Sequence, residues 1–168
     1  MKHIVVVVLI CLGLAVAPAI AQAQKIAYID LQKALNLSAA GKEAKEQIKA
    51  QVQGYDAEVK QRQEELKKLK EDLEKQAMLL SEEARSAKER DYQQKVKEYQ
   101  RFTKDIQETL QQMDADLTRK ILENLLEVAQ NLGKSVGYMM ILDKTESSIV
   151  YADESIDITD KVIEASEK

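Results

Sequence analysis

The sequence of 168 residues has one cysteine, one histidine and one proline, and it has no tryptophan. These single residues are Cys11, His3 and Pro18, and all lie in an N-terminal segment that we expect to be removed. The remaining chain cannot form a disulfide, a histidine or cysteine metal site, a Ser-His-Asp triad or a cysteine nucleophile. We therefore expect neither an enzyme nor a bound metal or cofactor.

The chain also lacks an excess of positive charge. Without Lys2, the chain keeps 24 Lys and Arg residues against 29 Asp and Glu residues, which gives a net charge of −5. Proteins that bind nucleic acid need clustered cations to neutralise phosphates, so nucleic acid is not the expected partner. The carboxylates are spread along helical segments, where a solvated helix face explains them better than a catalytic pair.

Residues 1–23 have the features of a secretory signal peptide. Lys2 supplies a positive start, and residues 4–16 form an apolar run that is too short to span a bilayer comfortably. Small residues then offer cleavage after Ala23 or after Ala21. We expect an exported protein, and the short apolar run disfavours the alternative of a retained anchor helix.

Gly133-Lys134-Ser135 matches the end of a phosphate-binding loop, but its surroundings do not. The loop needs a glycine five residues earlier, where this chain has Val128, and it must follow a strand rather than a long helical pattern. A glycine directly after Leu132 suits the left-handed end of a helix. We therefore predict that Gly133 is a helix C-cap.

Residues 41–132 are rich in helix-forming Glu, Gln, Lys and Ala, and Gly54 is their only interior glycine. Apolar residues recur there in steps of three and four, which is typical of a coiled coil. The first stripe is Ile48, Val52, Tyr55, Val59, Leu66, Leu69, Leu73 and Leu80, with Arg62 and Gln76 as its polar positions. The second stripe is Tyr92, Val96, Tyr99, Ile106, Leu110, Met113, Leu117, Ile121, Leu125, Val128 and Leu132, with Thr103 as its polar position.

The two stripes are separated near residues 78–86. Ser81 followed by Glu82 and Glu83 is a typical helix start, because the hydroxyl caps the first turn and negative charge suits the helix dipole. We predict an antiparallel helical hairpin with its tip at 78–86, forming an arm of about 60 Å at about 1.5 Å per residue. The alternative is one continuous helix that forms a parallel dimer.

The segments 24–40 and 133–168 flank the arm, and we expect them to form one small body. The expected strands are 25–30, 137–143 and 148–152, with 144–147 as the loop of a hairpin. Residues 31–38 can form one or two helical turns. Residues 157–168 are expected to be a closing helix with Asp157 as its N-cap and with Val162 and Ile163 facing inward.

A body of fewer than about 60 residues cannot build a large core alone. Three strands also leave open edges that favour association. The predicted fold is mainly α with a small β body, in which a long antiparallel helical-hairpin (coiled-coil) arm projects from a small β-sheet trimerisation body.

The chain after the signal segment resembles the Skp/OmpH family of periplasmic chaperones. The resemblance lies in "KIAYIDLQKAL" at 25–35 and most specifically in Ile149-Val150-Tyr151-Ala152 followed by Asp157-Ile158-Thr159. It implies a periplasmic homotrimer whose hairpins surround a central cavity. It further implies that unfolded outer-membrane β-barrel proteins are held there without ATP and are delivered toward the barrel-assembly machinery.

Well-studied members of that family carry strongly basic arms, whereas residues 42–132 here have 18 Lys and Arg against 20 Asp and Glu. We therefore expect neither lipopolysaccharide binding nor client capture by long-range charge. Apolar residues beside the stripes are the candidate client contacts, and they are Met78, Leu79, Phe102 and Leu126. The alternative for Phe102 and Leu126 is that they widen the buried stripe.

Two further interpretations stay open at this stage. A structural coiled-coil spacer or scaffold of the cell envelope, without chaperone activity, would need the same arm but no β body. A hairpin of an efflux adaptor would lie between β domains much larger than the two flanking segments.

Overall fold

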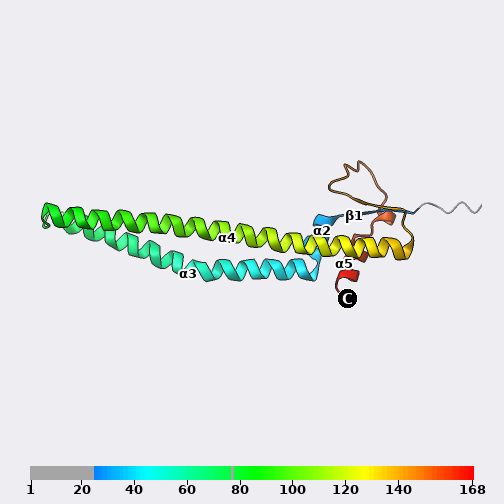
Figure 1. Ribbon diagram of the computed structural model, residues 1–168, viewed down its shortest axis with the longest axis horizontal. Helices are drawn as coiled ribbons and strands as arrows, with labels where there is room; N and C mark the ends of the chain where they lie inside the picture. The colour runs from blue at the N-terminus through cyan, green and yellow to red at the C-terminus, as the bar shows by residue number, and fades with distance from the viewer. Residues whose placement is uncertain (1–24, 77) are drawn as a thin grey trace, which may run out of the picture.

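The computed structural model describes residues 25–76 and 78–168, and the predicted signal peptide lies outside them. The elements in chain order are β1 (Ile26–Ile29), α2 (Leu31–Leu37), α3 (Ala39–Gln76), α4 (Glu82–Val136), β2 (Met140–Asp143), the 3₁₀ helix η1 (Glu154–Ile156) and α5 (Thr159–Ser166). Figure 1 shows α3 and α4 as a long arm that projects from a small body. The fold is mainly helical with a small sheet, as predicted, and the sheet has two strands. None of the helices in the described ranges is long and apolar enough to cross a membrane.

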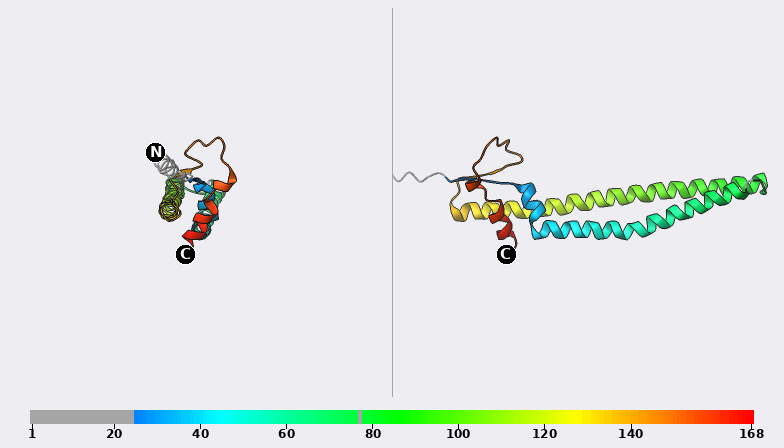
Figure 2. Two further views of the ribbon diagram at one scale, coloured as in Figure 1. Left: turned by 90° about the vertical axis from the view of Figure 1, so that its right-hand side faces the viewer. Right: turned by 180° about the vertical axis from the view of Figure 1, so that it is seen from behind.

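The arm is the predicted hairpin, and the continuous-helix alternative is wrong. α3 ends at Gln76, and α4 starts at Glu82 and returns to the body. Ser81 is the N-cap of α4, and its side chain accepts a hydrogen bond from the backbone N–H of Ala84 at 3.3 Å. In Figure 2, α3 changes direction partway along and converges on α4 toward the tip.

The predicted stripes form the interface between the two arm helices, which we call the seam. Each residue of both stripes, including the polar Arg62, Gln76 and Thr103, is partly or fully buried, with the exception of Val52. A spacing of three and four residues places such side chains on one helix face, so the local pattern identified the buried face correctly.

The sheet of the body pairs the two ends of the arm. β1 and β2 are parallel, and Ile26 lies opposite Met140 while Ile29 lies opposite Asp143. Parallel strands need a long crossover connection. In this chain the whole arm is that crossover, because α2, α3 and α4 lie between the two strands in sequence.

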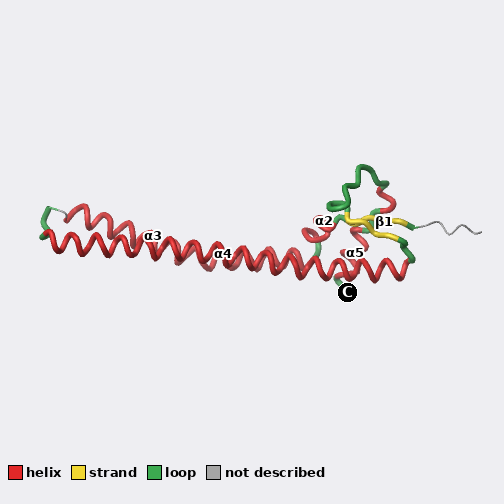
Figure 3. Tube along the Cα trace, turned by 45° about the horizontal axis from the view of Figure 1, so that its top comes forward, coloured by secondary structure: helices red, strands yellow, loops and turns green. Residues whose placement is uncertain are grey.

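The predicted third strand and its hairpin are wrong. Residues 148–152 form no strand, and the chain from 144 to 153 runs as a loop (Figure 3). The side chain of Asp143 accepts from the N–H of Thr145, and Ser148 has a positive φ of 49°, so the turns direct the chain away from β2. The outer edge of β1 is partly taken by Asp157, which forms an isolated parallel bridge with Tyr28.

One apolar core joins the body to the base of the arm. It contains Ala27, Ile29, Ala34, Ala44, Ile121, Leu125, Ala129, Ile158 and Val162. α4 therefore belongs both to the arm and to the body, since Leu125 and Ala129 pack with residues of β1 and α5. The division into 24–40, 41–132 and 133–168 stays a prediction.

Two predicted helix caps, Gly133 and Asp157, are wrong by a few positions in the sequence. α4 continues one turn beyond Gly133 to Val136, and its C-cap is Gly137, whose φ of 78° is left-handed. Gly133 serves close packing instead, because a Cβ there would lie 3.0 Å from Cδ1 of Ile141. The glycine thus lets α4 approach β2.

The closing helix α5 forms as predicted, but it begins at Thr159 with Ile158 in the cap position. Asp157 precedes the cap, and its carboxylate accepts from the backbone N–H of Thr159 at 2.8 Å and from the Thr159 hydroxyl at 2.5 Å. Val162 is buried and Ile163 is partly buried, so both face inward as predicted.

Candidate client-binding surface

The arm tip presents two large apolar side chains to solvent. Met78 is 99% exposed and Leu79 is 85% exposed. The backbone N–H groups of Leu79 and Leu80 both donate to the carbonyl of Gln76, which forms a tight turn. The side chains of Met78 and Leu79 extend from this turn into solvent. Two neighbouring exposed apolar side chains at the end of a projecting element are a candidate contact point for another chain.

Phe102 lies between the arm helices rather than on their free surface. Its ring meets the ring of Tyr55 edge-on, with 6.5 Å between ring centres. The guanidinium carbon of Arg62 lies 4.3 Å from the centre of the same Phe102 ring. The ring is partly buried by these contacts, as expected for a residue that widens the seam.

Leu126 lies near the body end of α4 and is 43% exposed, whereas the adjacent Leu125 is in the core. The structure therefore places the four candidates at the tip, within the seam and near the body, and it does not bring them together in one site. Their contact with a client stays a prediction.

Polar contacts between α3 and α4 occur in the half of the arm nearer the tip. Lys95 and Glu65 form an ion pair at 3.4 Å, and the amide of Gln63 donates to the Tyr99 hydroxyl at 2.6 Å. Lys88 donates to the side-chain oxygen of Gln76 at 2.8 Å. These bonds fix the register of the distal arm, although exposed ion pairs contribute only about 0–1 kcal/mol each.

The body carries a second exposed apolar surface. Val150 is fully exposed and Tyr151 is 83% exposed. Met140, the first residue of β2, and the preceding Met139 are also exposed. The sequence identified 148–152 as apolar and β-prone, but it did not reveal that this segment would have no partner within the described chain.

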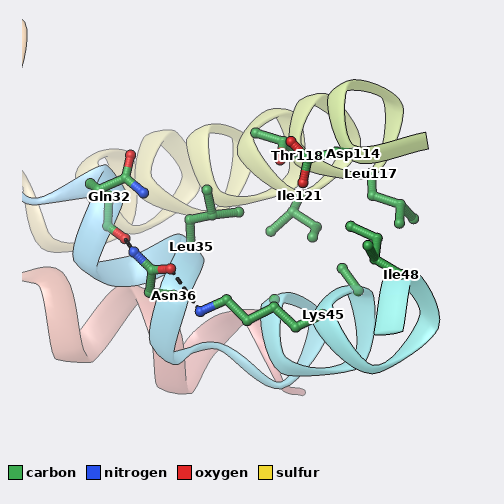
Figure 4. Close-up of a pocket in the computed structure, with 11 residues that line it drawn as sticks. Gln32, Leu35, Asn36, Lys45, Ile48, Asp114, Leu117, Thr118 and Ile121 are labelled. Atoms are coloured by element: carbon green, nitrogen blue, oxygen red, sulfur yellow. Dashed lines mark hydrogen bonds between the residues drawn. The ribbon is translucent and has the colours of Figure 1, made fainter. Parts of the chain in front are cut away.

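A hollow of about 330 Å³ lies at the base of the arm, where α2 approaches α3 and α4 (Figure 4). Its lining consists of Gln32, Leu35, Asn36, Gly41, Ala44, Lys45, Ile48, Asp114, Leu117, Thr118 and Ile121. Sequence reasoning missed this site because the hollow depends on how α2 packs against α4, and no local periodicity reports that contact.

Polar contacts also join the elements of the body. Lys33 of α2 donates to the carboxylate of Asp160 in α5 at 2.9 Å, and this hydrogen bond raises the pKa of Lys33. Burial on its own would raise the pKa of Asp157, but hydrogen bonds from Thr159 and the charge of Lys33 lower the pKa on balance. Within the described ranges there is no group of three or more His, Cys, Asp or Glu residues with metal-binding geometry.

This architecture defines a class of protein in which a helical-hairpin arm projects from a small body that contains a parallel strand pair. The model for the family "Outer membrane protein (OmpH-like)" matches residues 25–165, so the chain belongs to the OmpH-like family. The predicted family membership is thereby confirmed. No curated protein matches the chain.

A solved structure shares the fold. It is the crystal structure of an OmpH-like protein from Caulobacter crescentus CB15, described as a candidate outer membrane chaperone. The match has a TM-score of 0.78 and 19% sequence identity, and it covers 85% of this chain and 83% of that chain. At this identity the match establishes the common fold.

Proposed function

We propose that this protein is an ATP-independent holdase chaperone of the periplasm. It binds unfolded outer-membrane β-barrel proteins in a cavity between the arms of a homotrimer, prevents their aggregation and delivers them for outer-membrane assembly. The observation that carries this proposal is the arm of an OmpH-like chain, a projecting hairpin with a buried seam and exposed apolar side chains at its tip. A projecting arm suits capture of another chain better than it suits catalysis.

The body supplies the argument for assembly. β2 has an unpaired outer edge in the described chain, because the sheet consists of β1 and β2 alone. The segment 148–152 is β-prone, yet its Val150 and Tyr151 side chains lie in solvent. An open strand edge and an unpaired apolar strand sequence favour pairing between copies of the chain. Three copies joined at their bodies would place three arms around one space.

Client capture in this proposal rests on apolar contact. The arm residues 42–132 carry 18 cations against 20 anions, so long-range attraction of an acidic client is weak. Strands of outer-membrane barrels alternate apolar and polar residues, and they expose apolar side chains when unfolded. Met78 is suited to such varied partners, because methionine is flexible and polarisable. Phe102 would become available only if α3 and α4 separated, since its ring packs on Tyr55 and Arg62.

The charge balance also limits the set of partners. The proposal includes delivery to the barrel-assembly machinery, but it includes no lipopolysaccharide site, because the arm has no net positive charge to hold an anionic lipid.

The proposal is tested by diluting a urea-denatured outer-membrane barrel protein into buffer with the purified chaperone and following aggregation by light scattering. Wild-type protein should suppress aggregation without ATP. Met78→Ser with Leu79→Ser should weaken suppression, whereas Gln94→Ser on an exposed face of α4 should not. A wild-type protein that leaves aggregation unchanged would contradict the holdase and favour the structural spacer.

A further inference from the structure

We propose that the hollow between α2, α3 and α4 is an anchor site for one aromatic side chain of an unfolded client. This inference rests on the proposed holdase function and assigns a part of the client to a defined place on the arm. The hollow lies at the base of the arm (Figure 4), whereas the exposed Met78 and Leu79 lie in the turn between α3 and α4, at the opposite end of the arm.

Apolar side chains from all three helices form part of the lining of the hollow. Leu35 of α2, Ile48 of α3 and Ile121 of α4 line it, and Ala44 and Leu117 complete the apolar lining. Figure 4 shows the labelled apolar side chains directed toward the space between the helices. An aromatic ring placed against these side chains would bury part of its apolar surface, and such burial is favourable.

Polar groups around the hollow suit an aromatic ring better than an aliphatic chain. The ammonium group of Lys45 donates to the side-chain oxygen of Asn36 at 2.9 Å, which holds the cation beside the hollow. Cations bind the negative face of aromatic rings. Two such contacts already occur within this chain, between Arg62 and Phe102 at 4.3 Å and between Lys144 and Tyr28 at 5.7 Å.

The opposite wall offers a partner for a hydroxyl group. Asp114 and Thr118 line the hollow from α4, facing the wall that carries Lys45. A carboxylate accepts a hydrogen bond from a tyrosine hydroxyl, so the ring and the polar end of tyrosine would both be matched. Aromatic girdles are a regular feature of outer-membrane barrels, so unfolded clients of the proposed class carry many tyrosines.

Size and rigidity limit the occupant. The volume of about 330 Å³ is at the lower end of ligand sites, which span about 300–1,000 Å³, and it suits one side chain rather than a cofactor. The wall is preformed, because Gly41 brings α3 against α2 so closely that a Cβ there would lie 1.7 Å from the carbonyl oxygen of Leu35. A rigid hollow binds its occupant with little ordering of the protein.

The first test titrates wild-type full-length mature protein with N-acetyl-tyrosinamide and observes isoleucine δ-methyl NMR signals. The signals of Ile48 and Ile121 should shift, while the signal of Ile106 farther along the arm should not. N-acetyl-leucinamide at the same concentration should give clearly smaller shifts. Absence of tyrosinamide shifts, or equal shifts with both amides, would overturn the proposal.

The second test fills the hollow. Thr118→Phe places a ring in the space from α4, and Thr109→Phe places the same ring on an exposed part of α4 outside the lining. A tyrosine-rich peptide with the alternating pattern of a barrel strand should bind Thr118→Phe about tenfold more weakly than wild type, because the buried ring contact is lost. Thr109→Phe should bind like wild type. Equal affinity of the two variants would contradict the anchor site.

The aggregation assay separates the two proposals. If the wild-type protein fails to suppress aggregation but the tyrosinamide shifts occur, the holdase function fails and the hollow is still a site for aromatic groups. If suppression occurs without the shifts, the holdase stands and the anchor site is wrong. If Thr118→Phe fails to fold by circular dichroism, the amide titration of the wild-type protein still decides.

Discussion

The guanidinium of Arg62 in α3 stacks on the Phe102 ring of α4, with 4.3 Å between the guanidinium carbon and the ring centre. The Nε of Arg62 also donates to the Glu58 carboxylate at 3.0 Å, one turn back on α3. The charge that interrupts the apolar stripe is therefore accommodated within the helix interface. A cation–π contact at a partly exposed site contributes about 0.5–1 kcal/mol, less than the approximately 1.5–3 kcal/mol of a fully buried leucine.

Replacement of both polar positions on the α3 side of the seam should tighten the arm. We expect Arg62→Leu with Gln76→Leu to slow amide hydrogen exchange in α3 and α4 and to weaken binding of large clients more than small ones, because a tighter arm opens less. Exchange is read by mass spectrometry. Arg101→Leu, on an exposed position of α4, is the control and should leave exchange unchanged. Unchanged exchange in the double variant would show that these seam positions do not limit opening.

Gly41 and Gly54 should respond oppositely to alanine. A Cβ at position 41 would lie 1.7 Å from the Leu35 carbonyl oxygen, so Gly41→Ala must displace α2 from α3 and should lower the free energy of unfolding by about 2 kcal/mol. Gly54 lies within α3, and a Cβ there would meet no neighbouring atom within 4 Å. Gly54→Ala should therefore raise the free energy of unfolding by about 0.5–1 kcal/mol. Urea unfolding followed by circular dichroism measures both, and a tolerated Gly41→Ala would contradict the close approach.

The exposed segment of the body should control assembly. We expect sedimentation equilibrium of the wild-type protein at micromolar concentration to give about three times the chain mass, because the resemblance to the family implies a homotrimer and cyclic symmetry would close it. Val150→Glu with Tyr151→Glu should dissociate it, because a charge cannot be buried in an apolar interface without a partner. Ser147→Glu in the same loop is the control and should remain assembled. A wild-type monomer would contradict the trimer, and so would a dimer.

Client affinity should depend weakly on salt. Raising the ionic strength from about 0.05 M to about 0.5 M shortens the screening length from about 14 Å to about 4 Å. Affinity for an unfolded barrel, measured by fluorescence anisotropy, should hold or rise slightly, because apolar contact is not screened. A loss of about tenfold or more would show that local basic patches hold the client, contrary to the net arm charge of −2.

The Asp157 carboxylate should make the body sensitive to acid. Its folded pKa is lowered below the ordinary value near 3.8, since hydrogen bonds from Thr159 outweigh the effect of burial. A lowered folded pKa contributes stability above the unfolded pKa, and this contribution is lost as pH falls through the folded pKa. Asp157→Asn should therefore lower the urea midpoint at about pH 7, and its difference from wild type should shrink as the pH falls through the folded pKa of Asp157. Asp105→Asn, on an exposed part of α4, is the control, and a pH-independent difference for Asp157→Asn would contradict this origin.

The arm could be predicted because the spacing of apolar residues within each helix reveals which face of that helix is buried. Stripe positions such as Tyr55 and Leu110 recur every three or four residues, and the period alone selects the buried face. Ser81 marked the start of α4 because a capping hydroxyl acts on the next turn. Phe102 was harder to place, because it lies one position before Thr103 and becomes part of the interface only through its contacts with Tyr55 and Arg62.

The body could be predicted only in part, because its contacts are distant in sequence. Val150 and Tyr151 have a high propensity for strands, but propensity does not tell which edge of the sheet is free to pair with them. The outer edge of β1 is partly taken, because Asp157 forms a bridge with Tyr28. Gly133 and Gly137 are both compatible with a helix end, and packing against Ile141 decides between them. The hollow depends on three helices meeting, which no single stretch of sequence records.

The 55 residues of α4 run without a break from the tip to the core of the body. At about 1.5 Å per residue this helix is a beam of about 80 Å, clamped at one end by Leu125 and Ala129 against β1 and α5. A force applied at the tip therefore produces a large torque on the core contacts at the opposite end of α4. In the proposed trimer, substitutions in that core should therefore change the direction in which an arm leaves the body, and with it the width of the space between the arms.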